Sequence, residues 1–188
     1  MKRLYYDTET TGFPAKAGTP LADCPHIVQL AAAVIDDEAG KIAGFSVIIK
    51  PEGWEVGEGA AAVHGITTEK ATAHGIPIQV AMLMFSHLCK ISEQAVAHND
   101  EFDIKFIAYE IERLGQPNRL MDMPRYCTMK ATTNLCKLPG NYGKYKWPKL
   151  IEAHEHFFGE GFDGAHDALA DVLACARVHQ HLIKNNLI

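Results

Sequence analysis

The stretch Leu4-Tyr5-Tyr6-Asp7-Thr8-Glu9-Thr10-Thr11-Gly12 contains a short apolar run that ends in two acids and a turn. The run Leu4–Asp7 predicts a first strand, and the threonines and glycine that follow predict its end. Side chains two apart on a strand point to the same side, so Asp7 and Glu9 would converge on one spot. Their mutual repulsion would be relieved by a divalent cation. A solvated strand end explains the same spacing equally well.

The rest of the chain alternates strand and helix patterns. Ile27–Asp36 and Ile42–Lys50 predict two further strands joined by a turn, and Ala95–Ala97 predicts a short fourth strand. Apolar residues at helical spacing follow. Helices are expected at residues 60–64, 78–91, 102–114, about 147–159 and about 166–182, with a loop at 13–25. This order predicts an α/β fold with an antiparallel contribution early in the chain.

Length and composition predict one globular domain spanning residues 1–188. No apolar run is long enough for a membrane span, and Asp7 interrupts the place of a signal peptide, so we expect a cytoplasmic protein of a bacterium or a phage-infected host. The five cysteines are scattered, which favours reduced thiols over disulfides or a zinc site. The formal net charge of −5 argues mildly against a passive nucleic-acid binder but not against a nuclease whose acids bind cations.

Two further clusters hold residues that could do chemistry. In His98-Asn99-Asp100-Glu101-Phe102-Asp103 the acids fit the first turn of a helix, which is a complete structural explanation. In His166-Asp167-Ala168-Leu169-Ala170-Asp171 both acids share a helix face, and spacing alone does not choose between them. His166 would meet Asp171 only if it lies at the helix entrance.

Taken together, the three clusters resemble the motifs of the DEDDh family of 3′–5′ exonucleases. The matching residues are Asp7-Thr8-Glu9-Thr10-Thr11-Gly12, His98-Asn99-x-x-Phe102-Asp103 and His166-x-Ala168-x-x-Asp171, supported by Ile27–Ala31 and Val63–Thr67. The resemblance spans roughly residues 4–180. It implies a ribonuclease H-like fold, in which a central mixed β-sheet is flanked by helices and the Asp7 strand lies at the sheet centre.

The resemblance assigns Asp7, Glu9, Asp103 and Asp171 as metal-binding acids, makes Asp167 a bystander, and names His166 as the family's histidine. Two divalent cations, Mg²⁺ or Mn²⁺, would stabilise the attacking and leaving oxygens of a phosphodiester. Asp7 would bridge both metals, Glu9 and Asp171 would hold the one that activates water, and Asp103 would support the other. His166 would take the proton of the water, since an ordinary histidine pKa of about 6.5 suits a base near neutral pH. The expected activity is a 3′–5′ exonuclease, DNA favoured, that releases nucleoside 5′-monophosphates.

Residues for substrate binding are expected at Thr10, Phe102, Lys144 and Lys146. Thr10 follows the first acid pair, where relatives contact the terminal nucleotide. Phe102 would stack on a base or serve as an apolar helix anchor. The basic, aromatic segment 137–149 suits a single strand, although Trp147 and Leu150 would equally well dock the next helix.

Other interpretations stay open at this point. An RNA-directed exoribonuclease would differ only in its substrate. A hydrolase of small nucleotides would need no extended groove. A non-catalytic nucleic-acid-binding module is a third alternative, although it would gain nothing from acids beside phosphates. Expected partners are 3′ ends of single-stranded DNA or RNA, with a polymerase or a second copy in addition, and no membrane. The pairs His154/His156 and His179/His181 are interpreted as partly exposed helix residues.

Overall fold

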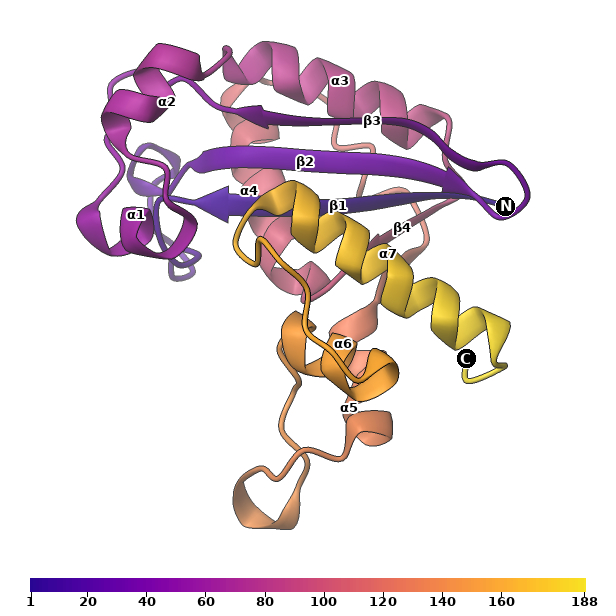
Figure 1. Cartoon of the computed structure of the whole chain (residues 1–188). Coiled ribbons are helices and arrows are strands. Elements are labelled where there is room, and N and C mark those ends of the chain that lie inside the picture. The colour runs from indigo at the N-terminus through magenta and orange to yellow at the C-terminus, as the bar shows by residue number, and fades with distance from the viewer.

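A computed structural model describes all residues from 1 to 188. Five strands form one mixed sheet in the order β3-β2-β1-β4-β5, with β1 at its centre (Figure 1). β1 (Lys2–Thr10) pairs antiparallel with β2 (Ile27–Asp36) and parallel with β4 (Gln94–Ala97). β3 (Gly40–Ile48) and β5 (Arg125–Cys127) form the two edges. The prediction of a central mixed sheet with the Asp7 strand in its middle is confirmed.

Helices cover both faces of this sheet. They are α1 (Glu58–His64), α2 (Thr68–His74), α3 (Ile78–Lys90), α4 (Asp100–Arg113), α5 (Thr128–Cys136), α6 (Leu150–Phe158) and α7 (Ala168–Lys184). α3 and α4 pack on one face and α7 on the other, while α5 and α6 form a smaller part beside them (Figure 1). No helix combines the length and the apolar character that crossing a membrane requires.

The alternation of side chains along β1 assigns each residue to a face. Leu4 and Tyr6 lie in the core under α3 and α4, whereas Tyr5 lies in the core under α7. Burial of large side chains such as these stabilises the fold by about 1.5–3 kcal/mol each. Because the alternation continues, Asp7 and Glu9 lie on the α7 side of the sheet and Thr8 on the α4 side.

Three elements were not predicted, namely α2, β5 and α5. α2 buries only Ala71, so it has no apolar periodicity, and its start depends on the Thr67 side chain, which accepts a hydrogen bond from the Lys70 N–H. β5 has three residues, too few for a recognisable alternation. The last helix begins at Ala168, two residues later than predicted, because Asp167 caps it.

The structure contradicts two further expectations. His154 and His179 are each 1% exposed rather than partly exposed. Both are satisfied inside the fold, His179 Nδ1 by the Tyr5 hydroxyl at 2.9 Å and His154 Nδ1 by the Glu160 carbonyl at 2.8 Å. Trp147 does not dock the following helix, because 62% of it is exposed.

Candidate active site

Strand β1 supplies the first two acids of the site. Asp7 lies opposite Ala31, and Glu9 lies opposite Gln29, just before an irregularity in the pairing between Glu9 and Thr10. Both side chains are partly buried, and both lie on the face that α7 covers. The pair therefore points toward the beginning of that helix, as the alternation of the strand requires.

Helix α4 supplies the third acid from the opposite face. Asp103 is 2% exposed, and its Oδ1 accepts hydrogen bonds from the Thr8 backbone N–H at 3.0 Å and the Thr8 hydroxyl at 2.7 Å. Oδ1 is thereby fixed, and Oδ2 makes no hydrogen bond to the protein. Asp100 has a structural role instead, because it accepts the Tyr6 hydroxyl at 2.6 Å and pairs with Arg125 at 3.2 Å.

The beginning of α7 supplies the fourth acid and the histidine. Asp167 is the N-cap, with its Oδ1 accepting from the Leu169 and Ala170 backbone N–H groups. His166 has a left-handed backbone (φ 70°) and lies just outside the helix, where its N–H donates to Asp171 Oδ2 at 3.0 Å. Asp167 thus serves as the cap of the helix, while Asp171 faces the cluster.

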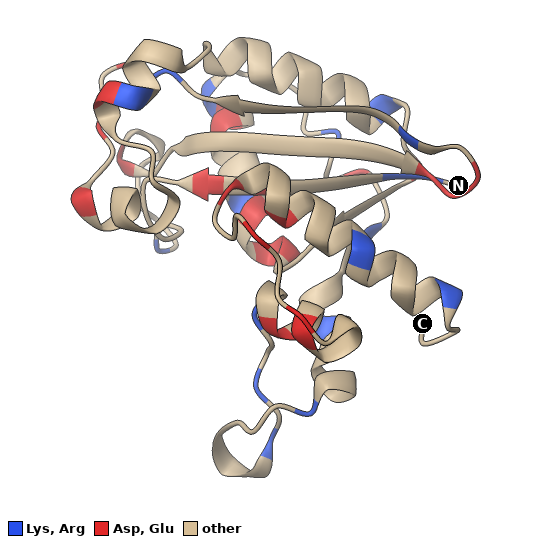
Figure 2. Ribbon diagram, viewed as in Figure 1, with Lys and Arg blue, Asp and Glu red and all other residues tan.

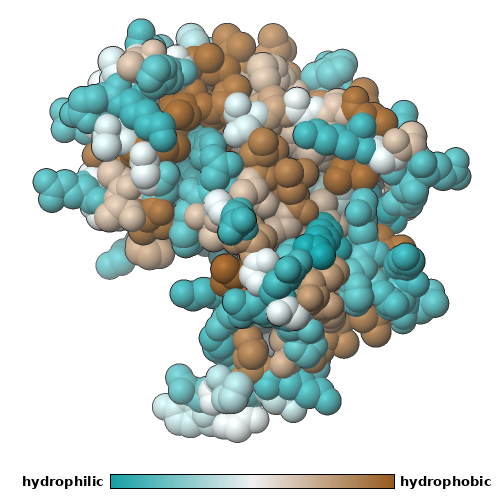
Figure 3. Space-filling model, viewed as in Figure 1, coloured by the Kyte–Doolittle hydropathy of each residue, from teal (hydrophilic) through white to brown (hydrophobic).

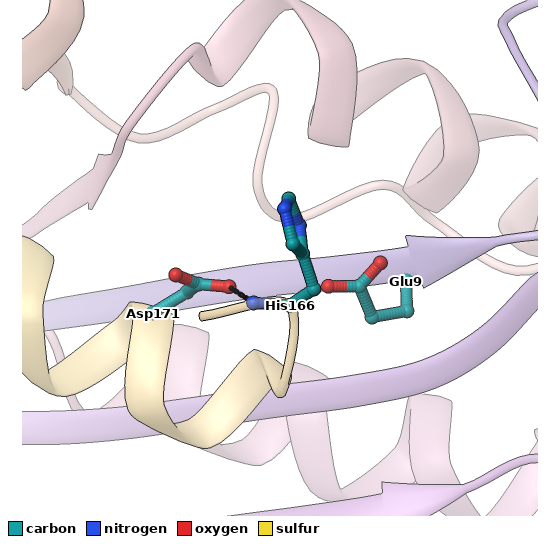
Figure 4. Close-up of side chains that lie close together, drawn as sticks. All are labelled: Glu9, His166 and Asp171. Carbon is teal, nitrogen blue, oxygen red and sulfur yellow. Dashed lines mark hydrogen bonds between the residues drawn. The ribbon is translucent and has the colours of Figure 1, made fainter. Parts of the chain in front are cut away.

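Glu9, His166 and Asp171 form a compact group, with the carboxylates on either side of His166 (Figure 4). One potential ligand atom from each lies within 4.8 Å of the others. With Asp7 and Asp103 they line a cavity of about 290 Å³. Its lining residues are Asp7, Thr8, Glu9, His98, Asn99, Phe102, Asp103, Leu150, His166 and Asp171.

Burial, with a smaller contribution from the neighbouring acids, raises the pKa values of these carboxyl groups. Burial, together with the carboxylates of Asp171 and Asp103, raises the pKa of Glu9 to about 8. Burial raises the pKa of Asp171 to about 6, although the His166 N–H opposes the change. Burial and the other acids raise the pKa of Asp7 well above its ordinary value. These carboxylates are costly to ionise together unless a cation is present. Mg²⁺ and Mn²⁺ prefer oxygen ligands of this kind.

Comparison with known proteins identifies the family. A family model described as Exonuclease matches residues 4–179. The chain belongs to the exonuclease family. The resemblance to DEDDh-type 3′–5′ exonucleases is thereby confirmed, and this exonuclease is an enzyme that hydrolyses phosphodiester bonds.

Two relatives have informative names. The uncharacterized exonuclease CP81 of Escherichia phage 186 is 32% identical over 178 residues, which cover 90% of this chain and 81% of the phage protein. The DNA polymerase III subunit epsilon of Buchnera aphidicola is 29% identical over 137 residues, which cover 72% of this chain and 54% of that subunit.

A solved structure of Escherichia coli exonuclease I with single-stranded DNA has the same fold. Its TM-score is 0.75 at 22% identity, over 98% of this chain and 40% of that chain. This exonuclease thus spans well under half of exonuclease I, and the likeness confirms the predicted ribonuclease H-like fold.

The predicted substrate residues fall into two groups. Thr10 and Phe102 line a second cavity of about 360 Å³, and Phe102 lines both cavities. The Thr10 hydroxyl donates to the Gly12 carbonyl at 2.8 Å, so it is engaged within the turn. Lys144 and Lys146 are exposed and line neither cavity, and Lys146 pairs with Glu152.

Three residues of the exonuclease site were not predicted. Thr8 holds Asp103, and strand alternation alone could have indicated it. Gln29 holds the beginning of α7, because its Nε2 donates to Asp167 Oδ2 at 3.1 Å and its Oε1 accepts the Ala168 N–H at 3.3 Å. His64 lines the second cavity, and its Nε2 is the one buried side-chain nitrogen or oxygen without a hydrogen-bond partner.

Proposed function

We propose that this exonuclease removes nucleotides from the 3′ end of single-stranded nucleic acid, DNA favoured, and releases nucleoside 5′-monophosphates by a two-metal mechanism. One observation carries the proposal. Four carboxylates from β1, α4 and the beginning of α7 converge on one cavity together with His166. We infer from this shared cavity that residues 1–188 work as one exonuclease domain.

Some carboxylate oxygens of the site accept hydrogen bonds from the protein, and others are available to bind cations. Asp103 uses Oδ1 for Thr8, and Asp171 uses Oδ2 for the His166 N–H, so each has a second oxygen to offer. We assign Glu9 and Asp171 to one cation, Asp103 to the second, and Asp7 to both. When bound, the two cations supply positive charge that stabilises the attacking and leaving oxygens.

His166 is assigned as the general base. Its side chain is exposed to the cavity and lies within 4.8 Å of Glu9 and Asp171. It makes no side-chain hydrogen bond to the protein, so a ring nitrogen is available to take the proton of the attacking water. The carboxylates beside it stabilise the imidazolium that results.

The terminal nucleotide is assigned to the second cavity. His64 Nδ1 accepts the Ile66 backbone N–H at 3.1 Å, so the neutral ring carries its proton on Nε2. That donor lies near the Thr10 backbone but makes no hydrogen bond of good geometry. It adjoins a cavity that Thr10 and Phe102 also line, where a nucleotide would supply an acceptor. Phe102, which lines both cavities, would lie between the base and the reacting phosphate.

DNA is favoured over RNA because of the relatives' names. One is a DNA polymerase III subunit, and one solved exonuclease I structure is a complex with single-stranded DNA. A polymerase partner or a second copy of the chain, and a cytoplasmic location, stay predictions. A non-catalytic binding module is disfavoured because four acids gathered in one cavity repel a phosphate unless cations are present.

The test uses 3′- and 5′-labelled single-stranded DNA and RNA with Mg²⁺, Mn²⁺ or EDTA. Stepwise shortening from the 3′ end is expected, lost in EDTA and in Asp7→Asn. Asp163→Asn, an exposed acid before α7, is the matched control and should retain activity. Folded protein that shortens no strand with either metal would refute the catalytic proposal, and faster cutting of RNA would reverse the sugar preference.

A further inference from the structure

The segment from just before β5 to the start of α6 has an unusual charge for this chain. Residues 123–151 contain six lysines or arginines and no aspartate or glutamate, although the whole chain has a formal net charge of −5. Three of these cations pair with acids elsewhere, namely Arg125 with Asp100, Lys130 with Glu101 and Lys146 with Glu152. The remaining three, Lys137, Lys144 and Lys149, are exposed and form no ion pair, so their charge is available to a ligand.

Residues 137–147, here named the basic hairpin, form a defined structure. The Gly140 N–H donates to the Lys144 carbonyl at 2.9 Å, and the Lys146 N–H donates to the Leu138 carbonyl at 3.0 Å. A Cβ on Gly140 would lie 2.6 Å from the Lys144 oxygen, so the two arms approach as closely as a glycine allows. The basic hairpin projects beyond α5 and α6, and lysines follow its length (Figures 1 and 2).

Tyr142 occupies the tip in a conformation that costs energy. It has φ 55° and precedes Gly143 with φ 71°, while the Lys144 N–H donates to the Asn141 carbonyl at 3.1 Å. These are the features of a type I′ turn, whose first central position normally holds Asn, Asp or Gly. An aromatic residue there is strained, and 99% of it is exposed. The ring therefore adds no packing that would offset the strain.

Two more aromatic side chains accompany Tyr142. Tyr145 is 46% exposed and Trp147 is 62% exposed. The corresponding lowest part of the surface in Figure 3 is pale and teal and stands clear of the body. Exposed rings among unpaired lysines match what single-stranded nucleic acids bind, because bases stack on the rings and phosphates contact the ammonium groups.

The basic hairpin is connected directly to the wall of the active-site cavity. Pro148 follows it and is buried, and its carbonyl accepts a hydrogen bond from His98 Nε2 at 2.9 Å. Both His98 and Leu150 line the cavity. Tyr142 lies six residues before Pro148, so the chain allows a separation of at most about 20 Å. A strand held in the cavity by its 3′ end would need to extend only that far.

We propose that the basic hairpin is a second binding site for single-stranded nucleic acid, contacting the strand several nucleotides 5′ of the terminus. Tyr142 stacks on a base, Lys137 and Lys144 contact phosphates, and Lys149, just beyond the hairpin, adds a third phosphate contact. This inference rests on the proposed function, since it assumes that the cavity holds the 3′ end. It places the predicted substrate contact of Lys144 on a part of the strand remote from the cavity.

Binding is measured without turnover in the Asp7→Asn background, by fluorescence anisotropy with labelled oligothymidylates of 2, 4, 8 and 16 nucleotides. Tyr142→Asn suits the turn better than tyrosine and should melt no earlier than its parent. It should weaken binding of the 16-mer about 5-fold or more and leave the 2-mer nearly unaffected. Tyr142→Phe should restore binding. Equal affinity of Tyr142→Asn and its parent for the 16-mer would overturn the proposal.

The lysines are tested by salt dependence. Lys144→Ser should reduce the slope of log Kd against log salt concentration by about 0.7 for the 16-mer. Lys184→Ser, at the far end of α7, is the matched control and should leave the slope unchanged. Failure of the proposed function would be recognised separately, as absent hydrolysis by the wild-type chain, because these binding measurements do not depend on turnover.

Discussion

Replacing Glu9 with glutamine should stabilise the metal-free protein at pH 8. Burial and neighbouring acids raise the pKa of Glu9 from 4.5 to about 8. The folded chain therefore binds this proton more tightly than the unfolded chain. The protonated Glu9 side chain therefore favours the folded state. This contribution to the free energy of unfolding is complete below pH 4.5 and is lost as the pH rises toward 8. Glutamine keeps the shape and removes the ionisation.

The magnitude follows from the same two pKa values. At about 1.4 kcal/mol per pKa unit, the interval from 4.5 to about 8 corresponds to about 5 kcal/mol. Water reaches the partly exposed Glu9 and screens part of this energy, so we expect a gain of about 1–2 kcal/mol. For a chain of this size each kcal/mol raises Tm by about 2–4 °C, so Glu9→Gln should melt about 2–8 °C higher at pH 8.

The assay is thermal unfolding in EDTA between pH 4.5 and pH 8, with Glu112→Gln, an exposed residue of α4, as the control. The difference between Glu9→Gln and wild type should disappear near pH 4.5. Added Mg²⁺ should stabilise the wild type more than the variant, because Glu9 is one of its proposed ligands. A variant that melts below the wild type at pH 8, or a difference that is the same at both pH values, would refute the reasoning.

Three further substitutions test single contacts. His166→Ala should lower the single-turnover rate about 10²- to 10⁴-fold with strand binding little changed, and a loss below tenfold would exclude it as the base. Thr8→Val removes the hydroxyl bond to Asp103 and should lower the free energy of unfolding in urea by about 0.5–1.5 kcal/mol. The same bond lowers the pKa of Asp103, so its loss should move the acid limb of the pH profile of kcat/KM to higher pH. An unmoved limb would contradict the assignment of Asp103 to the active site. Gln29→Leu frees Asp167 and the beginning of α7 and should weaken Mg²⁺ binding about 10- to 100-fold by calorimetry; unchanged affinity would show that Gln29 does not position the site.

Much of the sheet could be predicted from the sequence. β2 is buried over nine of its ten residues, and such a continuous apolar run is typical of a central strand. Alternation along β1 correctly predicted that Asp7 and Glu9 share a side. Local signals were also sufficient for α3 and α4, whose apolar residues recur at helical spacing over more than three turns.

The rest depends on contacts between distant residues. Whether Asp167 or Asp171 faces the cavity follows from a backbone angle at His166 and from the contact of Gln29 with Asp167, which are 138 positions apart. The burial of His179 depends on Tyr5, 174 positions away. Lys144 lies outside both cavities, on an arm that closes against Gly140, and no local pattern reveals so close an approach.

The alternation of side chains along β1 limits where this enzyme tolerates insertions and deletions. Thr8 holds Asp103 on one face, while its neighbours Asp7 and Glu9 lie on the other face and line the cavity. Both halves of the site therefore depend on the alternation along one strand. A single inserted or deleted residue between Leu4 and Asp7 would exchange the faces of all three side chains at once. Length changes in the 13–25 loop leave that alternation intact. Insertions and deletions can therefore accumulate in such loops, whereas the first strand can vary in side chains but not in length.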